Sequence, residues 1–263
     1  MLLRSITKHV KEQNWFAVAL DFFIVVVGIL IAFQITNWNE ARQIKADLIK
    51  AEKAIKRDLY LNYVVSKERI SLKECRIKNL QELSNQLLKP GDTWQGMSQL
   101  QSRYDELFAI DRVLRSPKRL WGSRIWKAEL AQGTFRTMDS ERRELLDGIF
   151  SQTDDQVILQ SNILDGQASL KVLSNTLELS RSDRLRYYDI VAKIDENSYW
   201  VEVVAGQIVR DIEALNIEFT EAEAKRLLEL SGTVFDLEER KEFYGDCVKP
   251  ITIPWFETSG TDN

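Results

Sequence analysis

The sequence has few of the residues from which small active sites are commonly built. Its 263 residues include one histidine, two cysteines, four prolines and eleven glycines. The histidine, His9, precedes the first long apolar run, so the rest of the chain has no imidazole for a Ser-His or Cys-His nucleophile or for a histidine-rich zinc site. The phosphate-binding patterns GxxxxGK[ST] and GxGxxG and the nucleophile elbow GxSxG are also missing. We expect no catalytic residues, no metal site and no cofactor.

The sequence also lacks a large excess of either positive or negative charge. The 36 basic and 40 acidic residues leave a net charge of −4, and no domain-sized block is strongly basic, which argues against a nucleic-acid partner. The acidic pairs Asp154–Asp155 and Glu238–Glu239 could belong to a carboxylate-based hydrolase that the sequence does not otherwise reveal. Neighbouring helical positions point in different directions, however, so we interpret both pairs as solvated helix surface.

A long apolar run near the N-terminus is the strongest feature that is present. Residues 15–35 read WFAVALDFFIVVVGILIAFQI, interrupted by Asp21 and Gln34, and this length suffices for a helix to cross a bilayer. Trp15 and Trp38 flank the run about 35 Å apart along a helix, which suits two interfacial anchors. A cleavable signal peptide is the alternative, but the run is too long and no A-x-A-like site follows it. We predict a transmembrane helix over residues 15–36.

The short tail before this helix, residues 1–14, bears on orientation. It carries three basic residues, Arg4, Lys8 and Lys11, although basic residues also follow the apolar run. Long domains are exported largely regardless of their charge, so the short tail should have more influence. We expect a cytoplasmic N-terminus and an exported domain.

One face of the predicted transmembrane helix has the composition of a contact surface. Five residues spaced three or four positions apart lie along a single stripe: Ala17, Asp21, Val25, Gly28 and Ala32. Gly28 and Ala32 form a small-xxx-small step at which a second helix can approach closely. Asp21 either extends toward the lipid headgroups or faces a polar partner, because a carboxylate facing lipid is costly. The stripe suggests a homo-oligomer or another membrane protein as partner, beside the lipid bilayer itself.

The same region resembles a known group of proteins. The stretch from Asn14 to Arg42, with its IVVVGILIA core and its QITNWNEAR exit, is similar to the N-terminal signature of a family of uncharacterised bacterial single-pass inner-membrane proteins. A weaker likeness covers residues 125–150, where a helix, Gly133 and a second helix follow one another. The resemblance implies an address in the bacterial inner membrane, with the domain in the periplasm if the orientation above holds. It implies no activity.

The sequence that follows the apolar run has the residue pattern of a series of helices. Apolar residues step by three, four or seven from Glu40 to Leu88, which favours one long helix continuous with the apolar run. Breaks at Gly, Pro and capping residues then delimit further helices. Their expected ranges are 98–115, 118–131, 139 or 140 to about 180, 182 or 183 to 215, 221–231 and 237–244. The core stripe of the helix that begins at 139 or 140 includes Leu146, Ile149, Phe150, Val157, Ile163 and Leu170.

These elements give an all-α class: an N-terminal transmembrane helix that continues into an elongated helical bundle. The predicted parts are the basic tail 1–14, the membrane helix 15–36, a soluble domain 37–247 and an extended tail 248–263 that packs on the bundle or on an interface. Cys75 and Cys247 are a candidate disulfide, with two buried thiols as the alternative. Sequence alone does not place them within bonding distance.

Three functions stay open at this point. The leading one is an anchored helical protein that binds a partner, in an assembly, scaffold or sensing role. The second is a receptor-like module that binds a small ligand among aromatic side chains, and the hydrolase is the third. The aromatic residues in question are Trp121, Trp126, Phe135, Tyr187, Tyr188, Tyr199 and Trp200. Each buries a large area, so the ordinary expectation for them is the core.

Overall fold

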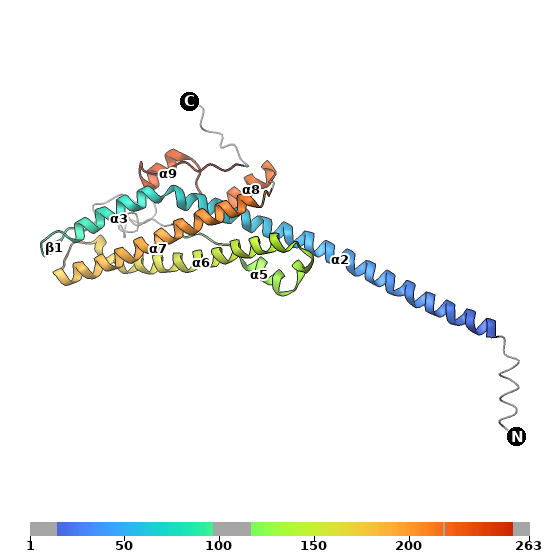
Figure 1. The fold of residues 1–263 in the computed structure, drawn as a ribbon. Helices are drawn as coiled ribbons and strands as arrows, with labels where there is room; N and C mark the ends of the chain where they lie inside the picture. The colour runs from blue at the N-terminus through green and yellow to red at the C-terminus, as the bar shows by residue number, and fades with distance from the viewer. Residues whose placement is uncertain (1–14, 97–116, 218, 255–263) are drawn as a thin grey trace, which may run out of the picture. The chain divides into compact units, whose positions relative to one another are not determined.

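The computed structural model describes residues 15–96, 117–217 and 219–254, with the backbone alone for residues 15–18 and 221. The chain divides into two compact units, residues 1–50 and 51–263. Helix α2, Trp15–Ser71, is 57 residues long and runs through both units (Figure 1). The described residues are mostly helical, which confirms the predicted class, as well as the continuity of the apolar run with the helix that follows it. The predicted helix 98–115 lies outside the described residues.

The helix predicted to Leu88 is interrupted once, at Leu72, where α2 ends and α3, Lys73–Leu87, begins. The Ser71 carbonyl explains the break. In an uninterrupted helix it would accept from the amide four residues later, but here it accepts from the Lys249 amide at 3.0 Å. A segment far along the chain has therefore replaced one bond of the helical ladder.

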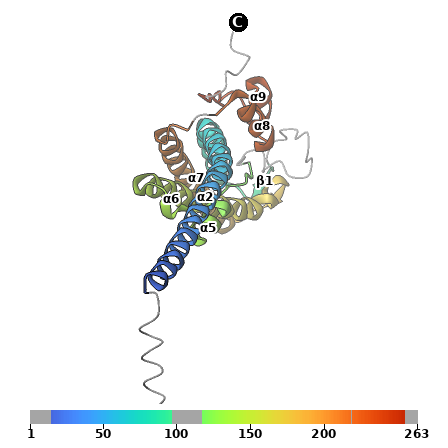
Figure 2. The same cartoon turned by 90° about the vertical axis from the view of Figure 1, so that its right-hand side faces the viewer.

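The second unit is built around two long helices, α6, Ser140–Leu170, and α7, Arg181–Ala214. They lie side by side in both views, and α3 packs along α7 (Figures 1 and 2). Asp139 caps α6 by accepting a hydrogen bond from the Arg142 amide. Ser180 and Asp183 form a capping box at the start of α7.

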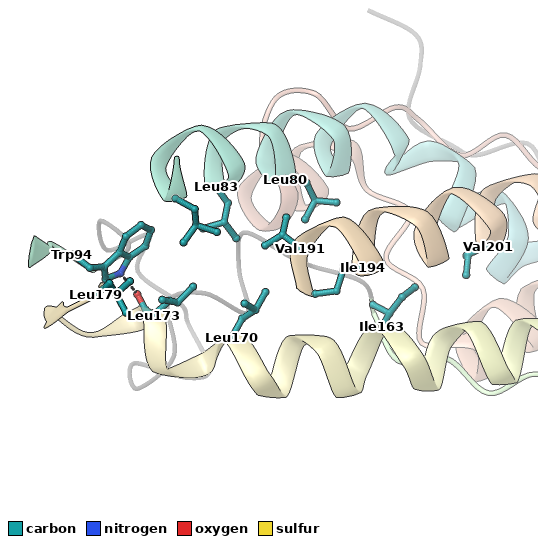
Figure 3. Close-up of a cluster of buried hydrophobic side chains, with 11 residues drawn as sticks. Leu80, Leu83, Trp94, Ile163, Leu170, Leu173, Leu179, Val191, Ile194 and Val201 are labelled. Carbon is teal, nitrogen blue, oxygen red and sulfur yellow. Dashed lines mark hydrogen bonds between the residues drawn. The ribbon is translucent and has the colours of Figure 1, made fainter. Parts of the chain in front are cut away.

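Buried aliphatic side chains fill the space between α3, α6 and α7 (Figure 3). The central members are Leu80, Leu83, Ile163, Leu170, Val191 and Ile194. At one end of this cluster the Trp94 indole Nε1 donates to the Leu173 carbonyl at 2.8 Å. The apolar residues of three helices thus share one core, as their spacing predicts.

The end of α6 differs from the prediction. Instead of continuing to Ser180, α6 stops at Leu170 and is followed by the 3₁₀-helix η2, Lys171–Ser174, and by strand β2, Leu177–Glu178. Strand β2 pairs antiparallel with β1, Thr93–Trp94. The Trp94 bond to the Leu173 carbonyl and the strand pairing are contacts with a distant segment, and no local sequence signal marks them.

Helix α5 is also shorter than expected. It covers Arg124–Ala131 rather than starting at Lys118. The preceding backbone is held by buried amide side chains instead: Asn62 bonds both the amide and the carbonyl of Gly122, each at 2.9 Å. Gly133, at φ 72°, ends the following turn as predicted and opens the 3₁₀-helix η1, Thr134–Thr137.

The last elements match the sequence-based expectation closely. Helix α8, Glu221–Ser231, has the predicted capping box of Thr220 and Glu223 and a left-handed Gly232 at its C-terminus. Helix α9, Leu237–Tyr244, follows. Both lie on the side of α2 and α3 away from α6 (Figure 2). In the tail the side chains of Val248, Ile251 and Ile253 are buried, so its described part packs on the second unit.

Candidate functional site

The apolar part of α2 presents its side chains to the outside. In its most apolar stretch of 18 residues no residue is buried. Of the predicted contact face, Asp21, Val25, Gly28 and Ala32 are exposed, whereas Ala17 is described by its backbone alone. A Cβ added at Gly28 would meet nothing within 4 Å, so this side of the helix is open for an approaching backbone. The helix has the length and composition of a membrane span, and also those of a signal sequence.

The two predicted interfacial tryptophans, Trp15 and Trp38, both lie on α2. Trp15 is the first residue of α2, with only its backbone described. Trp38 is exposed, and the Arg42 guanidinium lies 4.7 Å from its ring centroid. An indole beside a guanidinium one turn away is a combination suited to a membrane interface, where an apolar ring and a hydrated cation are both accommodated.

Cys75 and Cys247 are joined in a disulfide in the structure, with their Cα atoms 5.1 Å apart. The bond connects α3 to the segment after α9. Val248 and Leu72 are buried around it, in a small cluster separate from the main core. Stable disulfides form in oxidising compartments, so the bond suggests that the domain lies outside the cytoplasm.

A buried ionic network lies in the second unit, and it was not predicted from the sequence. Glu68 is almost completely buried, and its carboxylate accepts two bonds of 2.7 Å from the Arg119 guanidinium. Next to it, Arg69 donates to the Gln160 side chain at 2.7 Å and to the Pro117 carbonyl. Burial lowers the pKa of the Arg69 guanidinium to about 10, and the negative charge of Glu68 opposes that shift. Arg69 therefore stays charged at neutral pH.

Gln160 is the second connection of this network. In the Gln160 side chain, Oε1 accepts a hydrogen bond from the Arg119 backbone N–H at 2.9 Å, and Nε2 donates one to the Arg119 backbone carbonyl at 3.0 Å. A third arginine, Arg240 on α9, is also buried and donates to the Ser71 hydroxyl and to the Lys249 carbonyl. The network thus ties the segment before α5, helix α9 and the C-terminal segment to α2.

The arrangement suits structural support better than catalysis. Arginine guanidinium groups hold carboxylates and carbonyls in fixed positions, but none of these contacts supplies a nucleophile. Within the described ranges no group of three or more His, Cys, Asp or Glu residues could hold a metal ion. Of the two acidic pairs, Asp155, Glu238 and Glu239 are exposed, and Glu238 pairs with Lys241. Asp154 is half-buried instead, where it accepts a hydrogen bond from Ser123 and pairs with Lys127.

The aromatic residues considered for a ligand pocket do not gather in one place but form separate pairs and single positions. The buried Trp126 ring stacks with the Phe135 ring and with the Phe150 ring, at centroid distances of 4.6 and 5.4 Å. Tyr199 and Trp200 are neighbours on the exposed side of α7. Of the others, Tyr188 is exposed, while Trp121 and Tyr187 are half-buried. These side chains divide between the core and the surface.

Several buried polar residues escaped the sequence analysis. The predicted stripe of α6 placed Val157 in the core, yet Val157 is 47% exposed, and the buried positions belong to Thr153, Gln156 and Gln160. Their spacing of three and four is the one available signal, because it continues the apolar positions on both sides. A rule that admits only apolar residues to a core stripe overlooks it.

Comparison with known proteins adds one finding. Residues 21–106 match a family of unknown function, DUF6090. The match begins at Asp21, in the apolar part of α2, and reaches beyond α3, so it overlaps residues 21–42 of the stretch that carries the resemblance to uncharacterised membrane proteins. No curated protein and no solved structure matches the chain.

Proposed function

We propose that this protein is anchored in the bacterial inner membrane by residues 15–36 and acts by binding a second copy of itself or another membrane protein, without catalysis. The helical domain lies in the periplasm, where it serves an assembly, scaffold or sensing role. The observation that carries this proposal is the exposed apolar part of α2. Apolar surface of that length is costly in water and is stabilised in a bilayer.

The contact with the partner is proposed to lie along the Asp21 stripe. A carboxylate inside the hydrocarbon costs a few kcal/mol, about 2.5 to 3.5 at the bilayer centre, unless it reaches water or a polar partner. The open space at Gly28 permits a second helix to pack close to the same side. A neighbouring helix that approaches at Gly28 and Ala32 would also shield Asp21 from lipid.

The periplasmic address is supported by two independent features. The short N-terminal tail is basic, and such tails tend to remain in the cytoplasm. The Cys75–Cys247 bond requires an oxidising environment to persist. An alkaline phosphatase fused after Asn263 should be active and a fluorescent reporter that folds only in the cytoplasm should be dark. The opposite pattern would overturn the orientation.

Photo-crosslinking of the full chain in membranes tests the contact face. A photoreactive residue at position 32, on the stripe, should give a specific crosslinked product, whereas one at position 30, on the opposite side of the helix, should not. The product should diminish in Asp21→Leu and Gly28→Ile and persist in Leu30→Ile. Equal crosslinking from both positions, or no effect of either stripe variant, would mean that the helix is only a tether.

A further inference from the structure

A hollow of about 340 Å³ lies between α2 and α8, and none of the residues named above for the ionic network lines it. Two rows of side chains line it. Three residues come from α2 and five from α8 and the segment before it: Lys53, Lys56, Arg57, Phe219, Glu223, Arg226, Leu227 and Leu230. On each helix the lining residues are one, three or four positions apart, which places them on one face of that helix, and Phe219 lies just before α8.

The charge of this lining is unlike that of the chain as a whole. Four cations and one carboxylate line the hollow, a balance of 4 − 1 = +3, whereas the whole chain has a net charge of −4. The carboxylate, Glu223, is already engaged: it accepts from the Thr220 amide at 3.1 Å and from Lys56 at 3.4 Å. With Glu223 paired to Lys56, the three other cations of the lining, Lys53, Arg57 and Arg226, give the hollow its net positive charge.

The floor of the hollow is apolar. Phe219 and Leu227 are each only 9% exposed, and the Phe219 ring meets the Tyr60 ring edge-on at 4.8 Å. The Lys56 ammonium lies 4.8 Å from the centroid of the same ring. Leu230, at the rim, is 55% exposed and extends the apolar surface outward. Cationic rim and apolar floor together form an amphiphilic site.

We infer that this hollow binds an anionic amphiphile, a phosphate or carboxylate group attached to a hydrocarbon chain. The anion would be bound by Arg57 and Arg226, since guanidinium groups form paired hydrogen bonds with phosphate and carboxylate oxygens. The hydrocarbon part of the ligand would cover Phe219 and Leu230. The volume lies within the range of small-molecule pockets. This site is separate from the proposed membrane contact face and does not depend on it.

Titration calorimetry on the detergent-solubilised full chain tests the site, with hexyl phosphate, inorganic phosphate and hexanol as probes. We expect hexyl phosphate to bind one per chain and at least tenfold more tightly than inorganic phosphate, and hexanol to show no binding. The double variant Arg57→Gln, Arg226→Gln should weaken hexyl phosphate about tenfold or more. The control variant Arg136→Gln, Arg143→Gln removes the same charge from exposed positions elsewhere and should bind like the parent.

The outcomes separate the parts of the inference. Equal affinity for inorganic phosphate and hexyl phosphate would contradict the claim that the ligand needs a hydrocarbon part. Equal weakening by the two double variants would contradict the claim that Arg57 and Arg226 bind the anion. Native mass spectrometry then distinguishes the sources of the ligand. One phosphatidylglycerol per chain, without phosphatidylcholine, indicates a membrane lipid, and hexyl phosphate binding without a lipid adduct indicates a soluble molecule; either supports the site.

Discussion

Arg119 binds Glu68 through two parallel hydrogen bonds, from Nε and Nη2 to the two carboxylate oxygens, each 2.7 Å long. The two residues are 51 positions apart in the chain. Because Glu68 lies on α2 and Arg119 precedes α5, this pair fixes an irregular segment against the long helix. Its charges are largely removed from water, so the cost of breaking the pair differs from that of a surface ion pair.

Replacing Glu68 with Gln should lower the free energy of unfolding by about 3 to 5 kcal/mol, because Arg119 would keep its buried charge without a counterion. Glu74→Gln is the matched control. Glu74 pairs with Lys249, but both side chains are more than half exposed, and the loss there should stay below about 1 kcal/mol. Urea unfolding of the full chain in detergent measures both. Equal losses would show that the buried pair has no special role.

Two glycines of α6 should respond to alanine with opposite signs. A Cβ at Gly166 would lie 2.6 Å from Ile194 Cγ1, inside the core shared with α7, so Gly166→Ala should destabilise by about 1 to 3 kcal/mol. At Gly148 a Cβ meets nothing within 4 Å, and Gly148→Ala should stabilise by up to about 1 kcal/mol through helix propensity. Thermal unfolding of the two variants would contradict the packing if both shifted the midpoint in the same direction.

Some helix ends could be predicted from the sequence and others could not. The start of α6 after Asp139 and both ends of α8 follow from capping residues and a left-handed glycine, which act within a few residues. The end of α6 at Leu170 depends on Trp94, which is distant in sequence. The late start of α5 depends likewise on Asn62. Signals of short range were predictable, and contacts between distant segments were not.

The tyrosines of α2 should make the fold sensitive to alkali. Burial raises the pKa of Tyr60 from 10.0 to about 12. Burial, followed by the hydrogen bond to Glu213, raises the pKa of Tyr63 further above its ordinary value. Above about pH 10 the unfolded chain loses these protons while the folded chain retains them, so stability is complete below pH 10 and declines as the pH rises toward the folded values.

Tyr63→Phe tests this dependence. It should reduce the slope of the stability loss above pH 10, because one retained proton is removed, and should cost about 1.5 to 3 kcal/mol at neutral pH through the lost bond to Glu213. Tyr188→Phe, at an exposed position, should change neither quantity. Denaturant unfolding across the alkaline range provides the slopes. An unchanged slope in Tyr63→Phe would contradict the burial of its hydroxyl proton.

The disulfide predicts a redox response. Thiol labelling of the denatured protein without reductant should find no free cysteine, and Cys247→Ser should lower the free energy of unfolding by about 2 to 4 kcal/mol. Reductant should destabilise the parent by a similar amount and leave the variant unchanged, which serves as the control. Two labelled thiols per chain in protein from the native compartment would rule the bond out.

Of the two candidate sites, one could be predicted from residues close together in the sequence and the other could not. The stripe through Asp21 and Gly28 is a feature of one helix, so its spacing could be recognised in the sequence. The hollow lined by Arg57 and Arg226 joins residues from two separate helices, and their approach depends on how Phe219 packs on Tyr60. No periodicity within either helix could have indicated it.

The central claim is that the apolar part of α2 remains in the protein as a membrane anchor. The most direct test is to wash membranes containing the full chain with alkaline carbonate and to determine the intact mass of what stays behind. We expect the protein in the membrane pellet at about 30.5 kDa, the mass of the whole chain. A lighter, soluble product that lacks the sequence up to the end of the apolar run would identify a cleaved signal sequence and contradict the account.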